Sequence, residues 1–119
     1  MPWTSVCITD EDSARFERAG HRCISYVEAL REGHEQLLES DPEAFVIGEG
    51  VDDPGGVFGS TRGLKERFGE RVTDMPIAEN GVTGAAIAAA AAGMRPVFVH
   101  MRSDFLPMCM DQLVNHAAK

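Results

Sequence analysis

Between residues 25 and 40, apolar side chains recur at the spacing of one helix face. The positions on this stripe are Val27, Leu30, His34, Leu37 and Leu38. Ser25 can cap the first turn, with Glu28 three residues on as its capping-box partner, and Asp41-Pro42 stops the helix. The pattern therefore predicts an amphipathic helix from about Ser25 to Ser40.

Two short apolar runs follow a different pattern, because neither has a polar face. The first is Ala44 to Gly48, and the second is Val97 to Met101, which Arg95-Pro96 opens. Continuous apolar runs of this length indicate strands that are covered on both faces, as in a parallel sheet. A briefer strand is predicted at Arg71 to Asp74.

The stretch that ends at about Ala92 is composed almost wholly of Ala, Gly, Ile and Val after its first residues. Met75 to Gly81 leads into it, and Gly93 closes it. Because it has no charged face, we predict a helix that is buried on every side. Alanine is only weakly hydrophobic and Arg95-Pro96 interrupts the run, so we do not interpret it as a membrane span.

Cap and turn residues predict two further helices. Ser60 can cap a helix from Thr61 to Phe68, and Gly69 can stop it. The last helix is predicted from about Leu106 to Ala118, with Pro107 in its first turn. Since strands and helices alternate along the chain, the sequence predicts an α/β fold with a mainly parallel sheet flanked by helices.

Composition narrows the class of protein. A chain of 119 residues fits one domain, and its formal net charge of -8 argues against binding to nucleic acid or to an anionic membrane. Cys7, Cys23 and Cys109 have no CxxC spacing, which suits reduced thiols. Residues 1–21 are polar and resemble no secretory signal. We therefore expect a cytoplasmic chain in which an extension, or a short peripheral helix, precedes the domain at 22–119.

Ligands of parallel α/β sheets bind where loops leave the carboxyl ends of the strands. Three predicted loops qualify, at residues 49–58, 75–81 and 101–105. The first contains the glycine-rich stretch Gly55 to Ser60, which lacks the lysine of a Walker loop and the spacing of a dinucleotide fingerprint. We interpret this stretch as a turn-rich surface loop rather than a phosphate cradle.

Glu79 is the main candidate for chemistry. Ordinary capping would explain a carboxylate at the start of the apolar helix, because the helix dipole stabilises it there. The low polarity of the helix would also bury the carboxylate and disfavour its charged form, which favours a functional role.

His100, beside Arg102 and Asp104, is interpreted as a packed or solvated residue, and no metal site is predicted because the other histidines are scattered.

Several segments, read together, resemble the beta subunit of thiamine diphosphate-dependent 2-oxo acid dehydrogenases, the decarboxylating component. In chain order these segments are Ser25–Gly33, Phe45–Val51, Gly56–Leu64, Asp74–Gly84, Gly93–Val97 and Asp111–Lys119. Their order and spacing match over residues 22–119. The resemblance implies the N-terminal part of a transketolase-like, pyrimidine-binding domain that is incomplete at its C-terminus.

The resemblance also implies roles for individual residues. Glu79 matches the catalytic glutamate that hydrogen-bonds a ring nitrogen of the cofactor's aminopyrimidine and thereby activates the cofactor. Phe105 matches an aromatic residue that stacks on this ring, and Ile77 and Met101 match its apolar neighbours. Glu49 matches an acidic residue near the cofactor.

Departures from the family pattern imply partners. The chain lacks the Gly-Asp-Gly motif and following Asn that hold magnesium and the diphosphate in this superfamily, so an alpha-type subunit is expected to supply them. The family domain continues beyond Lys119, so a second chain is a further candidate partner. We expect a hetero-oligomer in which this chain is inactive alone. Two alternatives stay open: a transketolase-like or acyloin-forming enzyme, and a non-catalytic structural remnant.

Overall fold

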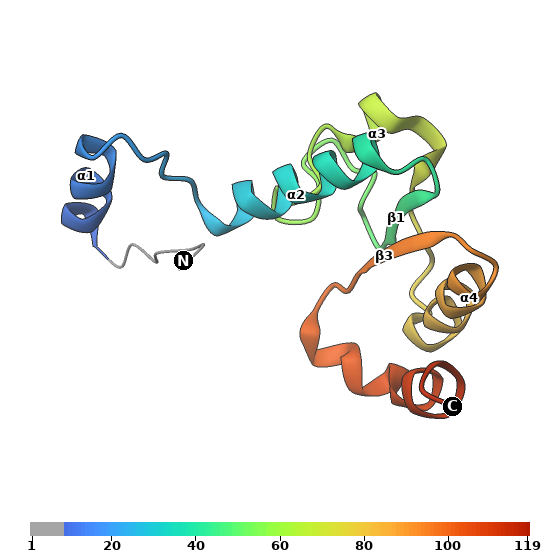
Figure 1. Cartoon of the computed structure of the whole chain (residues 1–119). Helices are drawn as coiled ribbons and strands as arrows, with labels where there is room; N and C mark the ends of the chain where they lie inside the picture. Colours follow the sequence, from blue (N-terminus) through green and yellow to red (C-terminus); the bar gives the residue numbers. More distant parts are fainter. Residues whose placement is uncertain (1–8) are drawn as a thin grey trace.

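Three parallel strands form the sheet at the centre of the structure, a computed structural model that describes residues 9–119. They are β1 (Ala44–Gly48), β2 (Val72–Thr73) and β3 (Arg95–Val99), in the order β2-β1-β3. Val46 of β1 is the partner of both Val72 and Val97, so the two neighbouring strands have the same register on the central one. The predicted α/β class with a parallel sheet is confirmed (Figure 1).

Helix α2 (Tyr26–Ser40) leads into β1 and begins as predicted. The Ser25 hydroxyl accepts a hydrogen bond from the Glu28 N–H, and the Glu28 carboxylate accepts one from the Ser25 N–H at 2.9 Å. This reciprocal capping box satisfies two backbone donors that the first turn of a helix leaves without partners.

Helix α3 (Leu64–Phe68) is shorter than the helix predicted from Thr61, and Ser60 does not cap it. The buried Ser60 hydroxyl instead donates to the carbonyl of Val57, and the Thr61 hydroxyl accepts from the Val57 N–H. These bonds hold residues 57–61 in a turn, so the helix begins only after Gly63, whose φ of 80° lies in the left-handed region. A 3₁₀ turn, η1 (Gly69–Arg71), then leads into β2.

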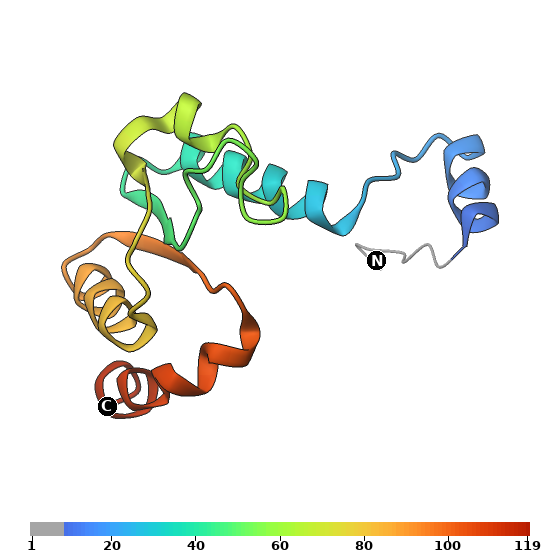
Figure 2. The same ribbon diagram turned by 180° about the vertical axis from the view of Figure 1, so that it is seen from behind.

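Helix α4 (Glu79–Ala91) connects β2 to β3 and packs against β3. The prediction that this helix is buried on every side is wrong for this chain, because only Glu79 and Thr83 of it are buried. Within residues 9–119, β3 and the C-terminal segment cover one side of the helix, and its other side is open (Figure 2).

The C-terminal segment is not the single helix predicted from Leu106 to Ala118. It consists of the 3₁₀ helix η2 (Ser103–Cys109), which contains Pro107, and the π-helix η3 (Gln112–Ala117). A proline lacks the N–H of a regular helical hydrogen bond, which favours irregular winding around it. Both elements pack against α4.

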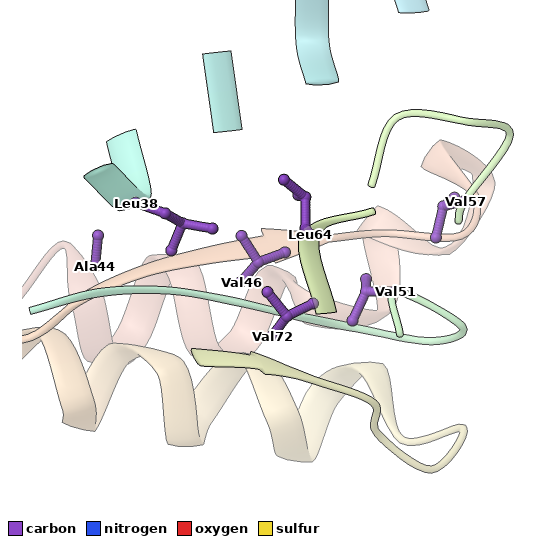
Figure 3. Packing of buried hydrophobic residues seen from close by; sticks show 7 residues of the cluster. All are labelled: Leu38, Ala44, Val46, Val51, Val57, Leu64 and Val72. Carbon is purple, nitrogen blue, oxygen red and sulfur yellow. The ribbon is translucent and has the colours of Figure 1, made fainter. Parts of the chain in front are cut away.

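The hydrophobic core lies on the face of the sheet that α2 and α3 cover. Its buried members are Leu38, Ala44, Val46, Val51, Val57, Leu64 and Val72, and Figure 3 shows their side chains pointing toward one another. The Arg71 guanidinium donates to the carbonyls of Leu38, Asp41 and Ala44 at the edge of this core. It thereby joins the end of α2 to the start of β1.

Helix α1 (Asp10–Arg18) stands away from the sheet in both views (Figures 1 and 2). For the segment before residue 22, the sequence left open an extension or a short peripheral helix, and α1 agrees with the helix. Cys7 lies outside the described residues, the Cys23 thiol donates to the carbonyl of Ser13, and Cys109 is a buried free thiol. In the part of the chain that the structure describes, no helix is long and apolar enough to cross a membrane.

Candidate functional site

The carboxyl ends of the three strands lie at one edge of the sheet, because all the strands are parallel. Glu49 follows β1, Asp74 follows β2 and His100 follows β3. The N–H of Gly50 donates to the Asp74 carboxylate at 2.7 Å, which ties the loop after β1 to the loop after β2. This edge is where a ligand of a parallel sheet is expected to bind.

Glu79 is the first residue of α4 and only 8% of it is exposed. Its carbonyl accepts a hydrogen bond from the Thr83 hydroxyl at 2.7 Å. No hydrogen bond or ion pair within residues 9–119 involves its carboxylate, and the preceding Ala78 provides no side-chain cap. The burial predicted for Glu79 is confirmed, although the helix that it begins is not enclosed on every side.

His100 lies on the same side of the sheet as α4. Side chains alternate along β3, so Val97 and Val99 pack on the hydrophobic core while Phe98 and His100 face α4. The rings of Phe98 and His100 lie 4.0 Å apart, centroid to centroid. Nδ1 of His100 is buried and has no hydrogen-bond partner within the described residues.

Electrostatics at His100 favour a neutral ring. Burial lowers the pKa of His100 below its ordinary value of 6.5, because desolvation disfavours the imidazolium, while the negative charge of Glu79 acts in the opposite direction.

A cleft of about 200 Å³ opens between α4, β3 and the C-terminal segment. Its walls are apolar except for Thr83 and His100. The lining residues are Thr83, Ala86, Ile87, Ala90, Pro96, Phe98, His100, Leu106 and Leu113.

The other residues singled out from the sequence lie around this edge in different settings. Glu49 is half-buried after β1, and Ile77, in the loop before α4, is 76% exposed. Phe105 is 38% exposed on η2, which packs on α4. Met101 is half-buried and packs against the hydrophobic core.

Sequence reasoning did not predict that His100 and Thr83 line the cleft, or that the Asp74 carboxylate joins the loops after β1 and β2. The alternation along β3 was the available signal for His100, because it places this residue and Phe98 on the face opposite Val97 and Val99. For Asp74, the only sign in the sequence was its place at the end of the brief predicted strand, where ligand-binding loops begin. Thr83 is four residues after Glu79, and this helical spacing puts both on one face.

Some backbone N–H groups of the glycine-rich loop are bonded within the loop itself. The N–H of Gly56 bonds the carbonyl of Asp53, and that of Val57 bonds the Thr61 hydroxyl. These contacts agree with a turn-rich loop. Within residues 9–119, no group of three or more His, Cys, Asp or Glu side chains gathers to hold a metal ion.

Comparison with known proteins places these features in a family. Residues 22–119 match the family described as "Transketolase, pyrimidine binding domain". The 2-oxoisovalerate dehydrogenase subunit beta of Bacillus subtilis is 42% identical over 97 residues, which cover 81% of this chain and 30% of that protein. The pyruvate dehydrogenase E1 component subunit beta of Staurastrum punctulatum is 45% identical over 91 residues, covering 76% of this chain and 28% of that protein.

A third relative has a different named activity. The acetoin:2,6-dichlorophenolindophenol oxidoreductase subunit beta of Cupriavidus necator is 40% identical over 108 residues, covering 82% of this chain and 32% of that protein. The chain therefore spans about a third of the length of these relatives. Because the family match extends over 22–119 and includes all three strands and the Glu79 edge, the chain belongs to the transketolase pyrimidine-binding domain family.

Proposed function

We propose that this chain supplies the aminopyrimidine-binding half of a thiamine diphosphate site, as part of a beta-type subunit of a 2-oxo acid dehydrogenase-like enzyme. The observation that carries the proposal is Glu79, a residue that is only 8% exposed at the carboxyl edge of the sheet and whose carboxylate forms no hydrogen bond or ion pair within residues 9–119. This carboxylate is therefore available to a hydrogen-bonding group of a ligand. A ring nitrogen of an aminopyrimidine is such a group.

The surrounding residues fit a flat, weakly basic ring. Ile77 and Phe105 are apolar side chains that remain exposed near the start of α4 and on the η2 segment beside it. A heteroaromatic ring would cover such apolar surface and would present one nitrogen to Glu79. When bound, thiamine diphosphate supplies the nucleophilic carbon for cleavage beside a carbonyl group.

Each residue then has a defined task. Glu79 hydrogen-bonds a ring nitrogen of the aminopyrimidine, the role that the family resemblance implies for it. Phe105 stacks on the ring, and Ile77 and Met101 bound it on apolar sides. Glu49, half-buried at the end of β1, adds a negative charge at the same edge.

The diphosphate and magnesium belong, in this proposal, to an alpha-type subunit. The net charge of -8 opposes a multiply charged anion, and in the glycine-rich loop the N–H groups of Gly56, Val57 and Ser60 are already bonded within the loop's own turns. Three relatives are named as subunit beta, which supports assembly with other chains in a hetero-oligomer. The open side of α4 and the exposed apolar residues of the C-terminal segment are surfaces that an alpha-type subunit, or a chain completing the beta subunit, would cover.

Calorimetric titration with thiamine diphosphate and magnesium tests the proposal, both on the chain alone and after mixing with candidate alpha-type chains. We expect binding only in the mixture, and we expect Glu79→Gln to reduce turnover of the assembled enzyme by about 100-fold or more, as for loss of a group that moves a proton. Glu66→Gln on the exposed face of α3 is the matched control and should leave turnover unchanged. Near-normal turnover with Glu79→Gln would remove Glu79 from the mechanism.

A second candidate function is that of an acyloin-forming or transketolase-like enzyme. The 40% identity between this chain and an acetoin oxidoreductase subunit beta supports this candidate. Product analysis with a 2-oxo acid, acetoin and a ketose donor separates the two activities. If the chain binds no thiamine diphosphate in any combination, the non-catalytic remnant becomes the better account.

A further inference from the structure

The loop after β1 and the loop after β2 are joined through a side chain. Backbone pairing between the two strands ends where Ile47 is the partner of Thr73. Beyond this pair, the Gly50 N–H donates to the Asp74 carboxylate at 2.7 Å. A hydrogen bond to a charged acceptor is roughly twice as strong as one between neutral groups. The Asp74 side chain therefore extends the contact between β1 and β2 past the end of the backbone pairing.

Both partners of this hydrogen bond lie next to buried residues. Val51 follows Gly50 and is fully buried in the hydrophobic core. Met75 follows Asp74 and is only 6% exposed. Gly50 has a φ of 69°, in the left-handed region that favours glycine, so the chain turns directly after Glu49. The hydrogen bond itself is exposed, so a substitution can remove it without opening the core.

The two joined loops carry residues that the proposed function assigns to the cofactor. Glu49 directly precedes Gly50, and Asp74 opens the segment that carries Ile77 and ends at Glu79. We propose that Asp74 is a positioning residue, whose carboxylate holds the loop that carries Glu49 against the loop that leads to Glu79. The expected effect on cofactor binding rests on the proposed function. Loops that are already in place favour binding, because less free energy is lost in ordering them.

The hydrogen bond can be tested without any cofactor. In the full chain, NMR should detect a scalar coupling across it, between the Gly50 nitrogen and the Asp74 carboxyl carbon. Asp74→Ala should speed hydrogen exchange at the Gly50 N–H by about tenfold, the factor expected for loss of a hydrogen bond to a charged group, while circular dichroism shows that the chain stays folded. Asp74→Asn keeps an oxygen that can accept the bond, so exchange should stay slow.

Asp53→Ala is the matched control, because it removes one negative charge from the loop after β1. Asp53 is exposed, and its carboxylate is not the acceptor of the Gly50 N–H. Exchange at Gly50 should therefore be nearly unchanged in this variant.

The positioning role is tested in assemblies that bind thiamine diphosphate. Calorimetric titration should show about tenfold weaker binding of thiamine diphosphate with Asp74→Ala, the equivalent of one such hydrogen bond. Asp74→Asn and Asp53→Ala should bind with nearly the natural affinity. Rescue by asparagine separates the hydrogen bond from the negative charge, which both Asp74 variants lack.

Three results would overturn the proposal. The first is unchanged exchange at Gly50 in Asp74→Ala, or, if this variant does not fold, no coupling between Gly50 and Asp74 in the natural chain. The second is an Asp74→Asn chain that behaves like Asp74→Ala in both measurements, which would assign the effect to the charge. The third is an unchanged affinity for thiamine diphosphate in assemblies with a folded Asp74→Ala chain.

Failure of the proposed function gives a different pattern. If no assembly binds thiamine diphosphate, the proposed function fails, while hydrogen exchange at Gly50 still decides whether Asp74 holds the two loops together.

Discussion

Two glutamates of this chain begin helices, and their surroundings give them different properties. Glu28 lies on the surface in a closed capping box with Ser25, so its partners are local. Glu79 begins α4 after Ala78, which has no capping side chain, and only 8% of it is exposed. Glu28 is thus an ordinary helix start, whereas Glu79 is a buried residue whose carboxylate has no hydrogen-bond partner within residues 9–119, and from it we infer a ligand.

The capping box predicts a pH-dependent contribution of Glu28 to stability. Hydrogen bonds from the Ser25 backbone and side chain lower the pKa of Glu28 below its ordinary value of 4.5. Because the folded-state pKa is depressed, the contribution is present above the unfolded value and is lost as the pH falls through the folded value. The difference in free energy of unfolding between the natural chain and Glu28→Gln should therefore shrink between about pH 7 and about pH 3.

Urea unfolding at both pH values, followed by circular dichroism, measures this difference. The matched control is Glu66→Gln at an exposed position on α3. A difference for Glu28→Gln that stays constant in acid would show that the charge of Glu28 makes no contribution.

At the scale of elements, the close approach of β1 and β3 depends on a residue without a side chain. A Cβ atom at Gly48 would lie 2.4 Å from the carbonyl oxygen of Val99 and 2.9 Å from a methyl carbon of Val51. The nearer atom belongs to the backbone of the paired strand, so it cannot move aside cheaply. At Gly33, within α2, an added Cβ atom would meet no atom within 4 Å.

Alanine at these two glycines should therefore have opposite effects. We expect Gly48→Ala to lower the free energy of unfolding by about 1–3 kcal/mol, because the strands must separate locally. Gly33→Ala should raise it by about 0.5–1 kcal/mol, since alanine loses less backbone freedom in a helix. Urea unfolding of the two variants side by side checks this, and a neutral Gly48→Ala would contradict the strand pairing described here.

At the scale of the whole molecule, the chain consists of a packed body and an arm. The body is the sheet with α2, α3, α4 and the C-terminal segment, and the arm carries α1 (Figure 1). Arg22 reaches back from the link to form two hydrogen bonds with Glu32 of α2, so the body retains this contact without the arm.

Deletion of residues 1–21 tests the proposed domain boundary. We expect the free energy of unfolding to change by less than about 0.5 kcal/mol, because no buried residue of α1 is lost. Deletion of residues 112–119 is the contrasting control, since it removes η3 from α4 and should be destabilising. A large loss of stability from the first deletion would place the arm within the folded domain.

Much of this fold could be read from local patterns. The Ser25 capping box and the strand at Ala44 to Gly48 each depend on residues close together in the chain, so cap chemistry and the apolar pattern predicted them. The strand predicted from Val97 to Met101 exists as well, but it runs from Arg95 to Val99, two residues earlier than predicted. The family resemblance over 22–119 also came from sequence alone and is confirmed. The roles of Glu79 and the residues matched around it stay predictions.

The remaining features depend on contacts between distant segments. Residues 57–61 form a turn because buried hydroxyl groups bond the backbone there, and α3 is consequently short. The burial of α4 depends on which elements pack against it, and its own composition overestimated this burial. The sequence by itself thus determined the parallel α/β class, the family and the candidate glutamate. Only the tertiary structure placed His100 in the cleft between α4, β3 and the C-terminal segment, because that position results from strand alternation on β3 and from the packing of α4 against it.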